Sequence, residues 1–182
     1  MSPISMSVAD TNYLLGLASL ATQIVTAALL VVFLMRAKDG FRDIARSVAN
    51  VGLWAAFLAV ITAAAFNIYY SDILGVEACY WCWWQRIFLY PQAVLFAMAL
   101  WKERYATTAI DASIVMSIIG AGISLYHHAL QMLPGSGLPC PAVGVSCSQR
   151  ILFEFGYITY PLMAFTVFAF LIVVLLVVRG KR

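Results

Sequence analysis

The stretch EACYWCWWQRIFLYP, residues 77–91, places a cysteine pair at the start of an apolar segment. Cys79 and Cys82 are three positions apart among three tryptophans, and Arg86 follows four residues after the second cysteine. The chain then continues largely apolar to Trp101. A reactive residue pair and a cation therefore stand where a helix would enter a membrane.

The composition is that of an integral membrane protein. Of the 182 residues, 64% are apolar and only 10% are charged, and the mean hydropathy is +0.92. A soluble domain carries about 25% charged residues, so the soluble globular class is excluded. No stretch is polar and long enough to fold as a separate soluble domain.

Five segments are long and apolar enough to cross a hydrocarbon core of about 30 Å, which needs roughly 20 apolar residues. They are residues 14–35, 47–70, 83–101, 107–131 and 155–178. The alternation typical of barrel strands is absent, so we expect helices, which satisfy their own backbone hydrogen bonds in lipid. The prediction is an all-α integral membrane protein with five transmembrane helices.

The first span differs from a cleaved signal peptide, the other class of N-terminal apolar segment. A signal peptide has a basic start and an apolar run of about 7–15 residues. Residues 1–13 contain no Lys or Arg, and the uncharged run that follows is 22 residues long. We therefore expect a retained helix with its N-terminus outside.

The basic residues predict the orientation of the helices, because short cytoplasmic loops are enriched in Lys and Arg. When the spans are threaded alternately, the opposite face receives only Arg86 and Arg150. Nine of the eleven basic residues fall on one face: Arg36, Lys38, Arg42, Arg46, Lys102, Arg104, Arg179, Lys181 and Arg182. This basic face is predicted to be cytoplasmic.

All four cysteines then lie on the extracytoplasmic side. Cys79 and Cys82 precede the third span, and Cys140 and Cys147 lie between the fourth and fifth spans. Disulfides persist in oxidising compartments and are rare in the cytosol. The sequence thus predicts two redox pairs on one face of the membrane.

The first pair has features of a reactive dithiol. A thiol reacts through its thiolate, and the start of a helix lowers a thiol pKa. If the helix has begun by Cys82, then Cys82 and Arg86 share a face. The guanidinium would stabilise a thiolate or the charge developing on an electron acceptor. Arg86 is 16 residues, or about 24 Å, before Lys102, so it lies near the outer interface. The alternative is an interfacial anchor among the tryptophans.

The second pair lies in a different setting. Residues 132–150 contain three prolines and three glycines, which predict a helix-free, adaptable loop around the C-x6-C spacing of Cys140 and Cys147. The alternative is that Cys140 and Cys147 form a structural disulfide that holds a short exterior loop in place. His127 and His128 lie at the end of the fourth span, on the same extracytoplasmic side. One of them would donate a hydrogen bond or a proton near Arg86. The alternative is that both are interfacial residues at a helix end.

The electron acceptor has to be something other than a nucleotide or haem. The chain has no GxGxxG and no P-loop, and Trp83 instead of histidine follows Cys82. Four cysteines could also bind zinc, but their neighbours are Trp and Pro, and we expect no metal. A dithiol at the lipid boundary beside a cation points to a membrane-dissolved quinone, ubiquinone or menaquinone.

The motif CYWCWWQR resembles the C-x-x-C-(aromatic)-(aromatic)-Q-R signature of the disulfide bond formation protein B (DsbB/BdbC-type) family. The resemblance implies a four-helix bundle core, formed by spans two to five, with one cysteine pair after its first helix and the other after its third. Residues 47–182 would be this redox domain. Residues 1–46 would comprise an exterior tail, an extra helix and a cytoplasmic basic loop.

The resemblance also implies an activity and a role for each site residue. The family oxidises an extracytoplasmic thioredoxin-fold (DsbA-like) thiol oxidase with a membrane quinone, in the bacterial inner membrane. Catalysis would use Cys79, Cys82, Cys140 and Cys147, with Cys140 forming the mixed disulfide with the partner. Cys82, Arg86 and His127 would bind the quinone, and His127 is preferred over His128 by its spacing from Cys140. No nucleic-acid partner is expected.

Two departures and one rival family accompany this resemblance. The helix at 14–35 is additional, and the second pair is closer together than in the best-known members. The vitamin K epoxide reductase family also uses two cysteine pairs and a quinone, but there the C-x-x-C follows the loop pair. A further alternative from another class is a non-catalytic scaffold or small transporter with two structural disulfides.

Overall fold

The computed structural model describes residues 8–133, 137–141 and 145–180. The N-terminal tail before Val8, parts of the second cysteine loop, and Lys181 and Arg182 lie outside these residues. The elements in chain order are α1 (Val8–Met35), α2 (Asp39–Ile68), a π-helical turn (Tyr69–Ile73), α3 (Tyr80–Trp101), a 3₁₀ turn (Glu103–Tyr105), α4 (Ala106–Met132), β1 (Phe153–Glu154), β2 (Ile158–Thr159) and α5 (Tyr160–Arg179).

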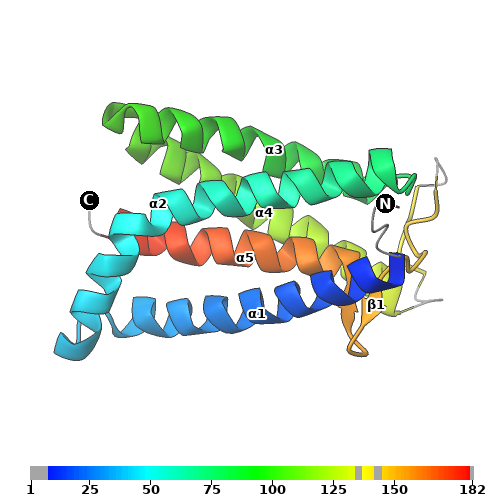
Figure 1. Cartoon of the computed structure of the whole chain (residues 1–182), viewed down its shortest axis with the longest axis horizontal. Coiled ribbons are helices and arrows are strands. Elements are labelled where there is room, and N and C mark those ends of the chain that lie inside the picture. The colour runs from blue at the N-terminus through cyan, green and yellow to red at the C-terminus, as the bar shows by residue number, and fades with distance from the viewer. Residues whose placement is uncertain (1–7, 134–136, 142–144, 181–182) are drawn as a thin grey trace, which may run out of the picture.

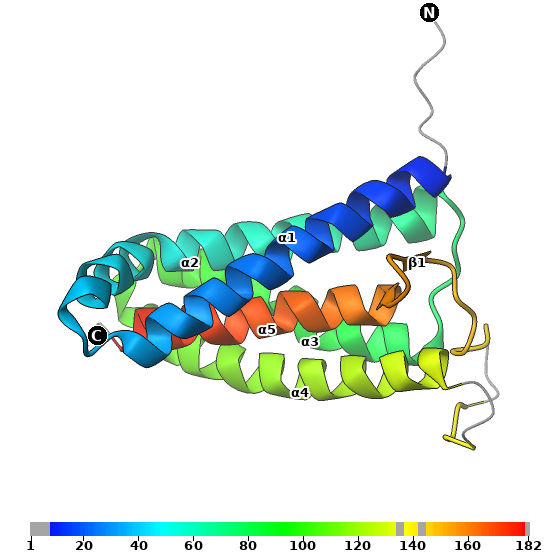
Figure 2. The same ribbon diagram turned by 90° about the horizontal axis from the view of Figure 1, so that it is seen from below.

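The five helices run roughly along one axis, and the bundle has two distinct ends (Figure 1). One end, which we call the cysteine end, holds the start of α1, the start of α3, the end of α4 and the β1–β2 hairpin. The basic end holds the start of α2 and the C-terminal turn of α5 (Figures 1 and 2). The cysteines and most of the described basic residues therefore lie at opposite ends, as the alternate threading predicts.

The prediction of an all-helical membrane protein is confirmed. Four of the five helices are long and apolar enough to span a bilayer: α1, α2 with its π-helical turn, α4 with the preceding 3₁₀ turn, and α5. Helix α3 has the required length but is less apolar. It carries Gln85, Arg86 and Gln92, and its Trp and Tyr side chains are amphipathic.

Three helix starts differ from the prediction by five residues or more. Helix α1 begins at Val8 instead of residue 14. Helix α2 begins at Asp39 instead of residue 47, because the segment expected as a loop is helical and carries the i,i+3 ion pairs Arg42–Asp39 and Arg46–Asp43. Helix α5 begins at Tyr160 instead of 155. A hairpin precedes it, whose type I′ turn has positive φ at Phe155 (53°) and Gly156 (76°).

Helix α1 differs from the other four in its packing. It crosses α5 obliquely (Figure 2), packs mainly against α5 and contacts α2 only lightly. Just 6% of its most apolar window is buried, against 50% for α5. The extra N-terminal helix is thus attached to the side of the four-helix core formed by α2–α5.

The core depends on close approach between α4 and α5. A Cβ atom built on Gly120 would lie 2.4 Å from Cζ of Phe168, whose side chain is 1% exposed. Three ring atoms lie closer to that position than a real Cβ contact allows, so alanine would force the buried ring to shift. Gly122, two residues further along α4, would place a Cβ with nothing within 4 Å.

We predict that Gly120→Ala destabilises the bundle by about 1–3 kcal/mol, because overpacking displaces the Phe168 ring. Gly122→Ala is the matched control. It should leave stability unchanged or raise it by up to about 1 kcal/mol through helix propensity. Thermal unfolding of both variants in detergent tests this, and equal melting temperatures for the two would contradict the packing.

Candidate active site

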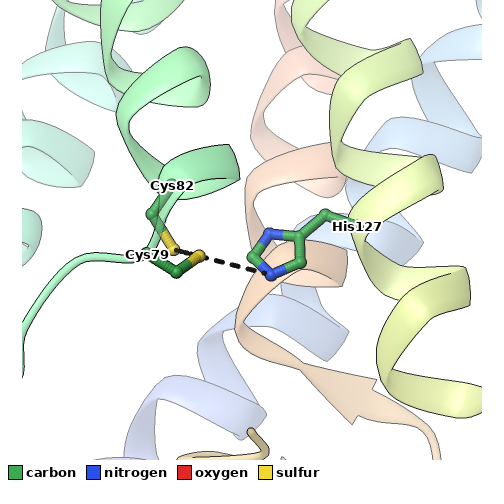
Figure 3. Close-up of side chains that lie close together, drawn as sticks. All are labelled: Cys79, Cys82 and His127. Atoms are coloured by element: carbon green, nitrogen blue, oxygen red, sulfur yellow. Dashed lines mark hydrogen bonds between the residues drawn. The ribbon is translucent and has the colours of Figure 1, made fainter. Parts of the chain in front are cut away.

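Cys79 and Cys82 meet at the first turn of α3. Cys79 is the extended N-cap residue (φ −70°, ψ 171°), and Cys82 lies one turn later, so their Sγ atoms are 2.9 Å apart (Figure 3). Cys79 is buried, and Cys82 is partly buried. The C-x-x-C spacing and the helix start therefore bring the two sulfurs into direct contact, which a dithiol–disulfide couple requires.

His127 reaches this pair from α4. Its side chain is 1% exposed, and Nε2 lies 3.6 Å from Cys79 Sγ and 3.1 Å from the Cys147 carbonyl oxygen. Nδ1 lies 3.5 Å from the amide nitrogen of Gln85. Because that amide donates, Nδ1 accepts and Nε2 carries the proton. The imidazole thus presents Nε2 toward Cys79 (Figure 3) and donates its N–H to the Cys147 carbonyl oxygen.

His128 points away from the cysteines. Its Nδ1 pairs with the Thr159 hydroxyl at 2.8 Å, next to the start of α5. Thr159 itself caps α5 by accepting from the Leu162 N–H at 3.3 Å. The structure therefore brings His127, and not His128, to the sulfurs.

The second cysteine pair packs against the first. Cys147 is 1% exposed and forms a cluster with Cys79 and Leu130, against which Cys82 and Cys140 also pack. Gln131 holds the loop in place, since its Nε2 donates to the carbonyl oxygens of Cys147 (3.4 Å) and Gln149 (3.0 Å). All four predicted cysteines therefore meet in one cluster.

The sulfurs have unequal acidities. A hydrogen bond to Cys82, with burial, raises the pKa of Cys79 to about 12, and burial, with a hydrogen bond to Cys140, raises that of Cys147 to about 12. Cys82 precedes the expected span at 83–101, and its pKa is lowered by the Cys79 hydrogen bond and by the Arg86 charge. Cys82 is thus the more acidic thiol of its pair.

Arg86 lies beside this cluster with one donor unused. Its Nη2 donates to the Ser71 hydroxyl and to the Asn67 carbonyl oxygen (3.5 Å), and its guanidinium lies 5.2 Å from the Trp83 ring centroid. Its Nε is buried without a hydrogen-bond partner. A buried N–H without a partner is costly, so the described residues leave the hydrogen-bonding capacity of this guanidinium incompletely used.

Two cavities meet at Arg86. A small one, about 40 Å³, is lined by both residues of the C-x-x-C pair, His127 and Cys147. A larger, mainly apolar one of about 450 Å³ lies between α1, α2, α3 and α5. Arg86 and Tyr160 line both. An apolar cavity that ends at a cation fits a molecule with an apolar tail and a ring that carries electronegative oxygens.

Cys79, Cys82 and His127 also form a possible metal-ligand group, with their ligand atoms within 4.8 Å of one another. Two thiolates on one tetrahedral zinc, each about 2.3 Å from the metal, lie about 3.8 Å apart. The observed 2.9 Å between the sulfurs is shorter. This geometry suits a redox pair better than a zinc site.

Several residues that complete the site received no role from the sequence. Gln85 stands inside the CYWCWWQR motif, and Gln131 is one helical turn after His127, so motif position and i,i+4 spacing were the available signals. Ser71 reaches Arg86 because a π-helical turn extends α2, a feature common at functional sites. No sequence feature singled out Tyr160. The fifth helix was expected to start at residue 155, which made Tyr160 an ordinary residue within it.

Comparisons with known proteins give a matching family model and several similar relatives. The sequence model of the family described as "Disulfide bond formation protein DsbB" matches residues 49–178. "Probable disulfide formation protein C" of Halalkalibacterium halodurans is 37% identical over 133 residues, covering 72% of this chain and 93% of that protein. "Disulfide bond formation protein C" of Bacillus subtilis is 33% identical over 135 residues, covering 72% and 95%. No solved structure matches.

We predict that Cys82 of the reduced protein is alkylated faster than Cys79 between pH 7 and 8, because the lowered pKa leaves more thiolate at Cys82 while Cys79 stays protonated. Arg86→Gln removes a charge that lowers the Cys82 pKa, so its alkylation at pH 7 should slow about three- to tenfold. Quantitative peptide mass spectrometry measures both rates. Arg104→Gln, at the basic end, is the control, and equal rates at the two cysteines would contradict the assignment.

Proposed function

Since the chain belongs to the DsbB family of disulfide bond formation proteins, we propose that it is a membrane thiol:quinone oxidoreductase that reoxidises an extracytoplasmic thioredoxin-fold thiol oxidase. The observation that carries the proposal is the packing of both cysteine pairs into one cluster beside Arg86. Isolated structural disulfides have no need to touch one another or to adjoin a cation.

The first exchange involves the second pair in its oxidised form. Cys140 is partly exposed while Cys147 is buried, so a partner thiolate reaches Cys140. A partner–Cys140 bond forms, the Cys140–Cys147 bond breaks, and Cys147 leaves. The partner's second thiolate then attacks its own sulfur in the mixed disulfide. The partner has lost two electrons, and Cys140 and Cys147 have gained them as thiols after taking up two protons.

The second exchange runs between the two pairs. Cys147 packs against Cys79, so its thiolate attacks Cys79, and Cys82 leaves. Cys82 is the better leaving group because its pKa is lowered, partly by Arg86. Cys140 then attacks Cys147, which restores the Cys140–Cys147 disulfide and leaves Cys79 and Cys82 reduced. His127, with an N–H toward Cys79 and Cys147, is placed to give or accept protons in this exchange.

A membrane quinone supplies the final acceptor of two electrons and two protons, and thereby returns Cys79 and Cys82 to the disulfide. On this chain, Cys82 would lie closest to the ring, and the Arg86 guanidinium, which lines both cavities, would stabilise the charge that develops on a ring oxygen. The Ser71 hydroxyl and the Trp83 ring hold the guanidinium in place. Ubiquinone and menaquinone both satisfy these contacts.

The proposal includes a position in the bacterial cytoplasmic membrane. All five helices, α3 included, span the bilayer, with the N-terminus and the cysteine end outside and the C-terminus in the cytoplasm. The described Lys and Arg residues at the basic end support this orientation. Residues 47–182 form the redox domain, and residues 1–46 add the extra helix.

We predict that purified protein reduces ubiquinone or menaquinone anaerobically when it is supplied with a reduced thioredoxin-fold dithiol. Cys82→Ser should abolish this turnover, and Arg86→Gln should lower it about ten- to a hundredfold, because one preorganised cationic donor is lost. Arg104→Gln is the control. Unchanged turnover in both site variants would refute the site, and no reduction by folded wild type would favour the scaffold. Stoichiometric zinc with thiols protected until chelation would favour metal binding.

The two histidines provide an independent check. His127→Gln should lower quinone reduction about tenfold or more, because it removes the N–H toward Cys79 and Cys147. His128→Gln, whose side chain faces Thr159, should retain activity within about twofold. Steady-state rates at saturating partner measure both, and the opposite ranking would overturn the proposed role of His127.

A further inference from the structure

The large cavity beside Arg86 is bounded on one side by a helix that the family match does not include. The match starts at residue 49, and α1 ends at Met35. Yet α1 contributes Leu15, Ala18, Ser19, Ala21, Thr22 and Val25 to the lining of the cavity of about 450 Å³. The extra helix therefore forms one wall of a space that leads to the redox site.

Small side chains on both sides create this space. Ala18 and Ala21 of α1 line it together with Ala55, Ala59 and Ala63 of α2. Small residues normally let membrane helices approach closely, but α1 and α2 contact each other only lightly. The helices stay apart where their residues would permit contact, so the space between them is suited to an apolar molecule.

The cavity opens to the lipid side between α1 and α2. Ala18 and Ala21 of α1, and Leu58 and Thr62 of α2, line it and are nevertheless exposed. The walls with buried lining residues, such as Leu89 of α3 and Phe168 of α5, are on the inner side. An apolar chain can therefore pass from the bilayer between α1 and α2 toward Arg86.

Polar contacts hold α1 in this position at the cysteine end. Asn12 donates to the Ile151 carbonyl oxygen at 3.1 Å and accepts from the Tyr70 hydroxyl at 2.5 Å. Further along, Gln23 accepts from the Tyr157 hydroxyl at 2.9 Å. These contacts hold α1 against the hairpin region and the π-helical turn that follows α2. They leave the cavity between α1 and α2 open.

We propose that α1 and α2 form a lateral entrance for the isoprenoid tail of the quinone, with α1 as a tail-binding wall. This inference rests on the proposed function. The occupant is indicated by the two ends of the cavity: the Arg86 cation, which also lines the small cavity at the C-x-x-C pair, for a ring oxygen, and an apolar opening to lipid for the tail. The ring lies at the Arg86 end of the cavity, the first prenyl units run past Ala21 and Ala59, and the remainder of a long tail leaves between the two helices.

The test measures binding instead of turnover, with both cysteine pairs oxidised so that no reaction occurs. Equilibrium binding of a long-tailed and a short-tailed quinone is compared in Ala21→Trp, which fills the cavity from α1, and Ala59→Trp, which fills it from α2. Ala27→Trp is the matched control, since Ala27 is an exposed residue of α1 that does not line the cavity. Melting temperatures establish that each variant is folded.

We expect both cavity variants to bind the long-tailed quinone at least about tenfold more weakly, because buried tail methylenes are lost. Binding of the short-tailed quinone should change less than about twofold, as should both affinities of Ala27→Trp. An effect of Ala59→Trp without one of Ala21→Trp would refute α1 as a wall. Unchanged binding in both variants, or bound phospholipid that quinone cannot displace, would overturn the inference. Wild type that binds neither quinone would instead refute the proposed function.

Discussion

The arrangement at the cysteine end depends on accommodating one cation, Arg86, at the start of an apolar helix. A charged side chain at membrane depth is costly unless its N–H groups find partners. Asn67 and Ser71 provide a carbonyl and a hydroxyl from the end of α2, and Trp83 provides its ring face. These contacts hold α2 against the first turns of α3, so the charge stays beside Cys82 without pairing with a carboxylate that would cancel its field.

The unequal pKa values of the clustered cysteines favour one direction of thiol–disulfide exchange. Cys79 and Cys147 are buried and of raised pKa, while Cys82 is the more acidic sulfur. Thiol–disulfide exchange favours attack in which the more acidic thiol leaves. In the proposed exchange, electrons that enter through the partly exposed Cys140 would pass inward to Cys82, the sulfur nearest to the Arg86 charge in sequence. His127 lies beside this exchange.

The extra helix shows how a peripheral element can extend a site without touching its chemistry. Helix α1 places no cysteine or histidine at the redox cluster, but Leu15, Ser19 and Thr22 line the cavity that ends at Arg86. Because lipid provides no hydrophobic force between helices, α1 needs the contacts of Asn12 and Gln23 to keep its position. The mainly apolar helix is held by its few polar residues.

The amino-acid sequence by itself determined the class of the protein and predicted the residues of its site. Apolar runs, basic loops and the CYWCWWQR motif are local features, so they indicated the helices, the common end of the cysteines and the position of Arg86 one turn after Cys82. Predictions from these features were wrong where a helix boundary depended on something other than hydropathy. The start of α2 at Asp39 and the hairpin before Tyr160 depend on ion pairs and turn geometry that hydropathy does not register. Only the tertiary structure placed both the His127 ring and Cys147 against Cys79, and left a cavity between α1 and α2. These results depend on how side chains far apart in the chain pack together, and a single sequence carries no record of those contacts.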